Sequence, residues 1–577
     1  MKIFLRLLKG ICIFIGAAVL ISSLVGFISG LIYRHQLRTL PNEVVLTYDL
    51  NDGLPEYTGR HSLLTWLENP PLSFIEAITA LDRAAKDKRV KGIVMRLDSG
   101  DLGNARTQDL REAILRFREG GKFAYAFADT LGAEGANPGA YYLATAFDQI
   151  WLQPSGDWGV LGVSIEIPFL RGLLDKIGIT PSFVARGKFK TAMNFLTERN
   201  FTPSDRLSME SLASDMFEQR IQDMAKGRGL PPQELRHAID NAPLSAQAAV
   251  KKKLVDKLGY VTDLKETACP DNKRAPTCIN LADYKDALPS RRLAKQVALI
   301  YTVGEISRGV SDFSPPWRGG SHIGADSLVE AINEAVENDS IDALVLRIDS
   351  PGGSYVASDT VWAALQKARK KNKPIIASMG DVAASGGYFV ALGAERIVAQ
   401  RGTITGSIGV IGGKIIGGKL AEKLDVNIGR IKIGDNADMW SPTQDFSPAA
   451  YARLTEWIET SYQDFLGKVA ESRKISLEEA DQAAQGRVWS GAQAKEHKLI
   501  DRTDGWQGAL QEVRTALALQ ENEPVEFITY PREESPLEEI VALLKGGNPL
   551  LNMGLPYWLT NLQTQGKQAR LAPFILR

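Results

Sequence analysis

The feature that most constrains the fold of this chain is an internal duplication. Three sequence blocks occur twice in the same order, with a nearly constant offset of about 250 residues. The paired blocks are Arg96–Asp101 with Arg347–Gly352, Gly139–Val163 with Gly386–Val410, and Leu244–Asp256 with Trp489–Asp501. A repeat of this length is far longer than a solenoid unit. We therefore expect two copies of one domain, an N-terminal repeat over 44–288 and a C-terminal repeat over 295–532, joined by a linker at 289–294.

The pattern within the second copy predicts the fold class. Apolar, β-branched runs at 297–303, 343–348 and 374–379 alternate with helical stretches at 326–337 and 357–369. Such alternation is typical of parallel βαβ units with right-handed crossovers. The sequence thus predicts tandem α/β domains whose chemistry lies where strands end and helices begin.

The N-terminal end of the chain is expected to be a membrane anchor. Residues Gly10–Tyr33 carry no charge over 24 positions, which is long enough for a helix to cross a bilayer. Lys2, Arg6 and Lys9 precede this segment, so the positive-inside rule favours a cytoplasmic N-terminus. Residues 1–43 are therefore expected to form a short cytoplasmic stub and the anchor, with the rest of the chain outside the cytoplasm. A cleaved signal peptide is the alternative, but its apolar region is normally shorter and ends in a small-residue cleavage site.

Composition argues against several other classes of function. Lys plus Arg number 68 and Asp plus Glu also number 68, so no net charge would attract nucleic acid. The chain has five His and three Cys without paired CxxC spacing, which does not indicate a zinc or haem site. We expect no metal or organic cofactor. The segment 533–577 contains one helical candidate at 536–545 and is given no role.

A candidate nucleophile stands in the segment Asp381–Tyr388 (DVAASGGY). Ser385 lies between small residues, after an apolar run and before a helical stretch, so its hydroxyl should be reachable. Free N–H groups at the helix start and in the turn Ser350–Ser354 could stabilise an oxyanion, which makes Gly386 and Gly353 the candidate donors. The alternative is that both glycine motifs are tight turns that serve packing alone.

A serine nucleophile needs a base, and the histidines do not supply one. None of them lies beside a strand-end motif, and no G-x-S-x-G elbow occurs, so a Ser-His-Asp triad is disfavoured. A lysine can serve if burial lowers its pKa from about 10.4 to about 7 or 8.

The two copies differ in complementary ways. Gly187–Ala192 (GKFKTA) aligns with Gly434–Met439 (GDNADM), whereas Ser385 aligns with Pro138, so each copy lacks what the other retains. With RIDSPGGS, GDVAASGGY and TGSIGV, this arrangement resembles the long, double-repeat form of the bacterial signal peptide peptidase A family, also called protease IV. The resemblance covers the expected anchor and both repeats.

The resemblance implies a role for three residues and a fold. Ser385 corresponds to the nucleophile, Lys190 to the general base, and Ser407 to a serine that orients the lysine. Lys188 is a rival base, because residues two apart in a strand share a face, and only the family match separates them. The implied fold is crotonase-like or Clp-protease-like.

The resemblance also implies an assembly and a substrate. The protein would be a homotetramer on the periplasmic side of the bacterial inner (plasma) membrane. It would degrade signal peptide remnants and similar apolar peptides, without a cofactor. Two alternatives remain open, a crotonase-type acyl-CoA enzyme and an inactive membrane-tethered scaffold.

Two cysteines fall near the end of the first copy, on the side expected to be oxidising. Cys269 and Cys278 lie nine positions apart, between what are expected to be the last helix and the last strand of that copy. The spacing allows a disulfide or two free thiols, and does not decide between them. Cys12, within the expected anchor, should remain a thiol.

Overall fold

The computed structural model describes residue 22 and most of the chain between residues 40 and 532. The described ranges are 40–58, 71–97, 102–132, 139–270, 275–289, 294–313, 321–521 and 523–532. The expected anchor at Gly10–Tyr33, apart from Ser22, and the helix expected at 536–545 lie outside these residues. No helix within the described part of the chain is long and apolar enough to cross a membrane.

The N-terminal repeat is built on a six-stranded parallel sheet with the order β8-β4-β3-β2-β1-β9. Its strands are β1 (Val44–Asp49), β2 (Val90–Arg96), β3 (Phe123–Ala128), β4 (Gln149–Leu152), β8 (Lys257–Leu258) and β9 (Thr277–Asn280). Its helices are η1 (Leu50–Asp52), α3 (Phe74–Lys86), α4 (Asn104–Glu119), α5 (Gly139–Ala144), α6 (Arg171–Ile177), α7 (Asn194–Thr197), α8 (Pro203–Arg228), α9 (Pro232–Asp240), α10 (Ala246–Lys251), α11 (Val261–Ala268) and α12 (Leu281–Ala287). The short strands β5 (Asp157–Trp158) and β7 (Leu244–Ser245) form a separate antiparallel pair.

The C-terminal repeat has the same core order, β15-β14-β10-β20, extended by β16, β17 and β19. Its main strands are β10 (Lys295–Val303), β14 (Ile341–Ser350), β15 (Ile375–Ala384), β16 (Arg396–Val398), β17 (Ile404–Gly406), β19 (Val488–Ser490) and β20 (Val525–Tyr530). A small sheet holds β11 (Glu305–Ser307), β12 (Asp312–Phe313) and β13 (Ser321–Gly324). Its helices are α13 (Ala325–Glu337), α14 (Tyr355–Arg369), α15 (Gly386–Ala391), α16 (Gly418–Lys423), α17 (Pro448–Arg473), α18 (Leu477–Ala483), α19 (Gly491–Glu496) and α20 (Gly505–Ala516).

The predicted α/β class is confirmed, and the elements expected in the second copy lie close to their predicted positions. The main difference concerns β15, which was expected to end at residue 379 but continues to Ala384. Pairing explains the extension, because the end of β15 lies between the end of β14 and β17. The strand therefore carries its backbone directly to Ser385.

Side-chain contacts repeat along with the strands. Tyr141 donates its hydroxyl hydrogen to the carbonyl of Leu254, and Tyr388 does the same to Leu499. Two ion pairs, Arg228–Asp256 and Arg473–Asp501, likewise occupy equivalent positions after the long helices α8 and α17. The duplication thus extends to the side-chain contacts within each repeat.

One of the hydrophobic cores extends across both repeats. A single cluster of buried side chains joins strands and helices of the first repeat to Leu299, Val345 and Trp506 of the second. Helix α4 of the first repeat packs on β15 and α20 of the second. Because α4 also packs on β3 of its own repeat, it lies between the two repeats and helps to fix their relative position.

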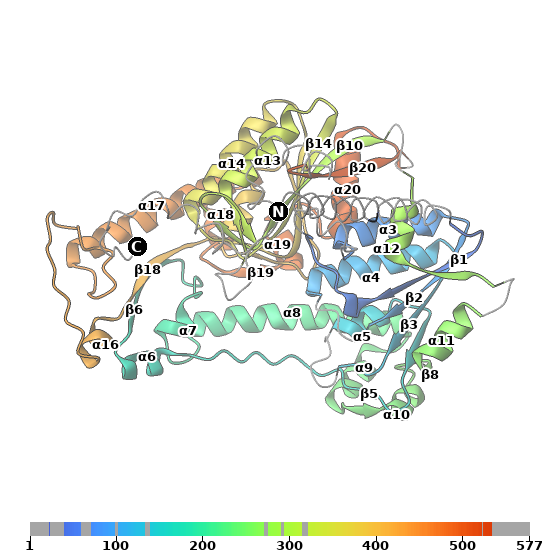
Figure 1. The fold of residues 1–577 in the computed structure, drawn as a ribbon. Helices are drawn as coiled ribbons and strands as arrows, with labels where there is room; N and C mark the ends of the chain where they lie inside the picture. The colour runs from blue at the N-terminus through green and yellow to red at the C-terminus, as the bar shows by residue number, and fades with distance from the viewer. Residues whose placement is uncertain are drawn as a thin grey trace, which may run out of the picture.

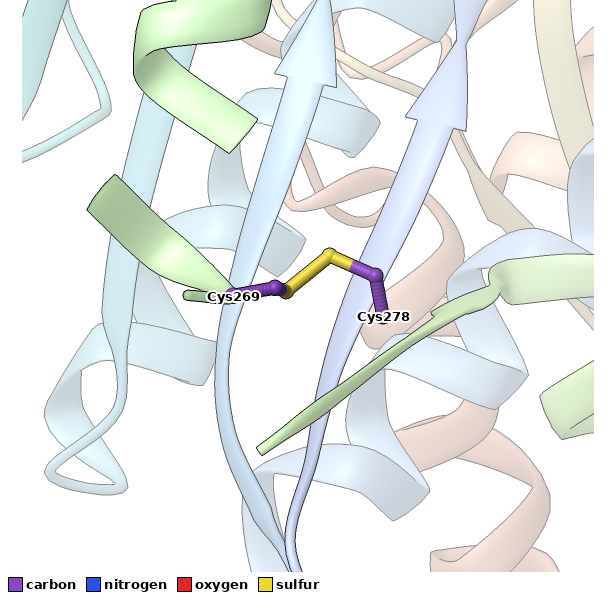
Figure 2. Close-up of a disulfide and its surroundings, with 2 residues drawn as sticks. All are labelled: Cys269 and Cys278. Carbon is purple, nitrogen blue, oxygen red and sulfur yellow. A yellow bond between two sulfur atoms is a disulfide. The ribbon is translucent and has the colours of Figure 1, made fainter. Parts of the chain in front are cut away.

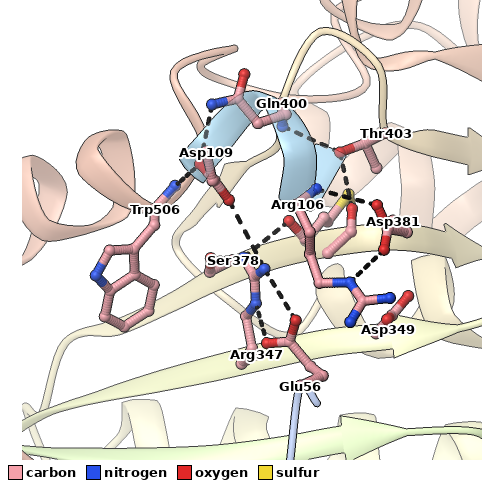
Figure 3. A network of polar contacts seen from close by, with 12 residues as sticks. Glu56, Arg106, Asp109, Arg347, Asp349, Ser378, Asp381, Gln400, Thr403 and Trp506 are labelled. Carbon is pink, nitrogen blue, oxygen red and sulfur yellow. Dashed lines mark hydrogen bonds and ion pairs between the residues drawn. The ribbon is translucent and has the colours of Figure 1, made fainter. Parts of the chain in front are cut away.

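A buried polar network crosses the same interface (Figure 3). Arg347 on β14 is fully buried, and its guanidinium donates to Glu56 of the first repeat at 2.7 Å. Its Nη2 atom also lies 3.7 Å from the Asp109 carboxylate on α4. Nearby, Arg106 of α4 pairs with Asp381, four residues before Ser385. Because buried charges must be paired, these contacts allow few other relative placements of the repeats.

A second link between the repeats lies beyond the ends of the main sheets (Figure 1). Strand β6 (Thr180–Arg186) of the first repeat pairs antiparallel with β18 (Val410–Ile416) of the second, with Arg186 opposite Val410. The long helix α8 follows β6 in sequence, and α17 contacts both strands. Each repeat therefore sends one strand into a shared ribbon.

A disulfide closes the edge of the first sheet (Figure 2). Cys269 caps the C-terminus of α11, and its sulfur is bonded to that of Cys278 in β9, with the Cα atoms 5.9 Å apart. Helix α12 follows β9, so the expectation that the helix before Cys269 is the last of the repeat is wrong. The bridge fastens the edge strand β9 to α11.

Candidate active site

Ser385 lies where β15 ends and α15 begins. Its backbone has φ 52° and ψ −117°, a conformation that non-glycine residues rarely adopt. The amide of Ser385 donates to Gly406 in β17 at 2.9 Å, which holds the turn in place. Such strain persists only where the surroundings impose it, and it is concentrated at functional sites.

Lys190 of the first repeat reaches Ser385 of the second. Its Nζ atom lies 2.9 Å from Ser385 Oγ, and it also lies 2.8 Å from the carbonyl oxygen and 3.0 Å from the Oγ of Ser407. Only 7% of Lys190 is exposed, and burial lowers its pKa to about 7. A neutral amine is thus accessible near neutral pH, as a general base requires.

The β6–β18 ribbon explains how residues so far apart in sequence meet. Arg186 ends β6 opposite Val410, the first residue of β18, and the chain then turns so that Lys190 faces the site. Ser407 precedes β18 and follows β17, which pairs with the end of β15. Neighbouring strands therefore position the lysine, Ser407 and Ser385 together.

The structure separates Lys190 from its rival Lys188. The expectation that the two share the face of a strand is wrong, because Gly187–Lys190 forms a turn after β6, closed by the Lys190 amide on the Gly187 carbonyl. Lys188 is exposed, and its Nζ lies 4.9 Å from the ring centre of Phe189. Because of this turn, the Lys190 side chain is buried and the Lys188 side chain is exposed to solvent.

Gly353 and Gly386, the candidate oxyanion donors, line the same pocket as Ser385. Neither amide donates to another described residue. Gly353 has φ 147° and approaches Ile306 so closely that a Cβ atom would lie 2.2 Å from its carbonyl oxygen. A Cβ added at Gly386 would likewise lie 3.2 Å from the Gly353 nitrogen. Both amides are therefore hydrogen-bond donors without a described acceptor, and they lie close to Ser385.

A pocket of about 220 Å³ opens beside these groups. Besides the polar groups above, its walls include Val356, Phe389, Val410, Ile411, Trp457 and Phe465. These apolar residues were missed in the sequence because they come from α14, α15, β18 and α17. Trp457 on α17 is 47% exposed. A tryptophan on the solvent-facing side of a helix is the one feature of the sequence that could have indicated a binding surface here.

Comparisons with known proteins identify the family of this chain. The model for peptidase family S49 matches residues 122–273 and 367–520, one segment in each repeat. The chain is 29% identical over 517 residues to the protein named Serine protease SPPA, chloroplastic, from Arabidopsis thaliana, covering 87% of this chain and 74% of the relative.

Two bacterial relatives are named Protease 4. The one from Haemophilus influenzae is 27% identical over 542 residues, covering 88% of this chain and 84% of the relative. The one from Salmonella typhi is 30% identical over 448 residues, covering 74% and 69%. The chain therefore belongs to peptidase family S49, as a serine peptidase with two copies of the family domain.

Proposed function

We propose that this peptidase is a Ser–Lys endopeptidase with Ser385 as the nucleophile and Lys190 as the general base. The observation that carries the proposal is the 2.9 Å approach of a buried lysine amine to a strained serine hydroxyl. Ser407 supports it, since both its oxygens lie within hydrogen-bond distance of the amine.

The reaction follows from these positions. Neutral Lys190 takes the proton of Ser385 Oγ as that oxygen attacks the peptide carbonyl carbon. The Gly353 and Gly386 N–H groups stabilise the resulting oxyanion. The lysine ammonium, held by Ser407, then gives its proton to the leaving amine, and the peptide bond breaks to leave an acyl-serine. Lys190 next takes a proton from water, whose oxygen attacks the acyl carbon. The bond to Ser385 Oγ then breaks, and the lysine ammonium returns the proton to Oγ, which releases the acid and restores the serine.

The pocket supports an apolar substrate. Aliphatic and aromatic side chains line it beside Ser385, so a peptide with apolar residues at the cleavage site would bury them there. Signal peptide remnants meet this description. An anchor at Gly10–Tyr33 would hold the enzyme at the inner membrane, with both repeats in the periplasm, where such peptides partition.

Self-association as a homotetramer is part of the proposal. The segment between α16 and α17 exposes several large apolar side chains, with Ile431 94% and Ile433 89% accessible. Several large apolar side chains exposed in one segment favour contact with another protein surface. A second copy of the chain is the partner that the family resemblance implies.

The two alternatives have less support. An acyl-CoA enzyme would not need a lysine buried against a serine, and an inactive scaffold would not need to keep a pair placed across two repeats. The family match favours a peptidase over both.

The test is hydrolysis of a fluorogenic apolar peptide by the full-length protein in detergent. We expect Ser385→Ala to lose activity by roughly 1000-fold or more. Ser340→Ala, at an exposed position outside the pocket, is the matched control and should retain wild-type activity. Equal activity of Ser385→Ala and wild type would refute the proposal.

A further inference from the structure

A three-residue segment between α18 and β19 contacts both the lysine turn and Ser407. The Gln485 carbonyl accepts from the Phe189 amide at 2.8 Å, one residue before Lys190. The Arg487 carbonyl accepts from the Ser407 amide at 2.7 Å. Backbone atoms of Gln485–Arg487 thus bridge the candidate base and the serine that holds it.

Gly486, at the centre of this segment, lies against the backbone of Lys190. A Cβ atom at Gly486 would lie 2.4 Å from the Lys190 nitrogen and 2.6 Å from its Cα and Cβ. Gly409 closes another side of the same side chain, since a Cβ there would lie 3.1 Å from Lys190 Cδ. Glycine at both positions leaves a slot that fits the lysine stem and excludes water from it.

Side-chain contacts anchor the segment to the second repeat. The Gln485 amide group donates to Asp481 at 2.7 Å and to the Tyr462 hydroxyl at 3.3 Å. Tyr462 in turn donates to Asp481 at 2.6 Å and accepts from the Gln485 backbone amide at 3.4 Å. The guanidinium of Arg487 lies 5.3 Å from the ring centre of Phe189, which adds a contact to the lysine turn.

We propose that Gln485–Arg487 is a positioning segment. It sets the distance between Lys190 and Ser385 and excludes water from the lysine amine. The proposal rests on the proposed role of Lys190 as the base. It assigns no chemical step to the segment, which acts through the lysine. Its loss should therefore lower kcat while leaving KM nearly unchanged, because the apolar pocket residues are untouched.

Gly486→Ala tests the positioning segment directly. The added methyl group must push the lysine turn away from Gly486, and a displacement of about 1 Å costs on the order of 100-fold in rate. We expect a fall in kcat of that order, and an upward shift in the pH midpoint of kcat/KM as water reaches the amine. Gly467→Ala in α17, where a Cβ meets no atom within 4 Å, is the matched control and should behave as wild type.

Tyr462→Phe provides a second test that preserves packing. Losing the hydroxyl removes its two hydrogen bonds from Gln485 and its one to Asp481, while the ring stays in the core and Gln485 keeps its own bond to Asp481. Because Gln485 is then held less firmly, kcat should fall about threefold to tenfold. If Gly486→Ala does not give folded protein, an unchanged kcat in Tyr462→Phe overturns the proposal. If Gly486→Ala folds, a wild-type kcat and a wild-type pH midpoint in that variant overturn the proposal.

Lys190→Ala distinguishes this proposal from the one on which it rests. If Lys190→Ala is inactive while Gly486→Ala and Tyr462→Phe match wild type, the lysine is the base and only the positioning role fails. If Lys190→Ala is active, the proposed function itself fails.

Discussion

The two repeats share a sheet order but contribute different parts of the proposed site. In the second, β15 runs ten residues to Ser385, whereas the equivalent strand β3 of the first has six residues. In the first, the turn after β6 buries Lys190, whereas the aligned turn at 434–437 of the second is exposed and has Ala437 in its place. The comparison shows how a duplicated chain can form one site from parts of both repeats. Such a site requires the interface between the repeats to hold Lys190 close to Ser385.

The largest effect should come from removing the half of the site that the first repeat supplies. Lys190→Ala should lower peptide hydrolysis by roughly 1000-fold or more, because the members of a catalytic unit fail together. Lys188→Ala, two residues away and exposed, should retain most activity. Steady-state assays of both variants measure this difference. An inactive Lys188→Ala beside an active Lys190→Ala would show that Lys188, and not Lys190, is the base.

The next effect concerns equivalent arginines in the two repeats. Arg347 is fully buried and pairs with Glu56 of the other repeat, whereas Arg96 is partly exposed and pairs with Asp129 of its own. Arg347→Ala should lower the free energy of unfolding by about 3 to 5 kcal/mol, since it leaves buried carboxylates unpaired.

The matched change Arg96→Ala should cost about 1 kcal/mol or less, because exposed pairs contribute little. Denaturant unfolding of both variants measures the difference. Equal losses would mean that the buried network does not hold the repeats together.

A smaller asymmetry lies in the edge strands β9 and β20, which both pair with the first strand of their sheet. Only β9 carries a cysteine, and its disulfide closes a short loop. Cys278→Ser should destabilise the first repeat by about 2 to 3 kcal/mol.

Thermal unfolding with and without reductant checks this expectation, with Cys12→Ser as the control. Thiol counting on denatured, unreduced protein should find one free thiol. Three free thiols would contradict the bridge.

The smallest effect should appear at Glu112 of α4, which faces the second repeat and accepts from Gln400 at 3.0 Å. Burial, together with Asp109, raises the pKa of Glu112 to about 7. Its folded pKa exceeds its unfolded value of 4.5, so stability falls as pH rises from about 4.5 to about 7.

Glu112→Gln should therefore be more stable than wild type above about pH 7, by on the order of 1 kcal/mol, with no difference below about pH 4.5. Unfolding measured at both pH values tests the sign. A less stable variant at high pH would show that the carboxylate charge is stabilised by the interface.

Local sequence patterns predict much of the fold and one part of the candidate site. Alternating strands and helices predicted the α/β fold, and small residues around Ser385 predicted a reachable hydroxyl at a strand end. Lys190 was identified only through family resemblance, since its burial depends on pairing between β6 and β18, more than 200 residues apart. The Arg347–Glu56 pair was missed for the same reason, because no spacing rule links residues of separate repeats.

The central claim is that a lysine of one repeat activates the serine of the other. The most direct measurement is the rate constant for acylation of Ser385 by a serine-reactive probe, followed from about pH 9 to about pH 5 in wild type and Lys190→Ala. The wild-type rate should fall as pH drops through about 7, because protonation of Lys190 removes the base, and Lys190→Ala should be slow throughout. A wild-type rate independent of pH, or a variant that acylates as fast as wild type, would contradict the claim.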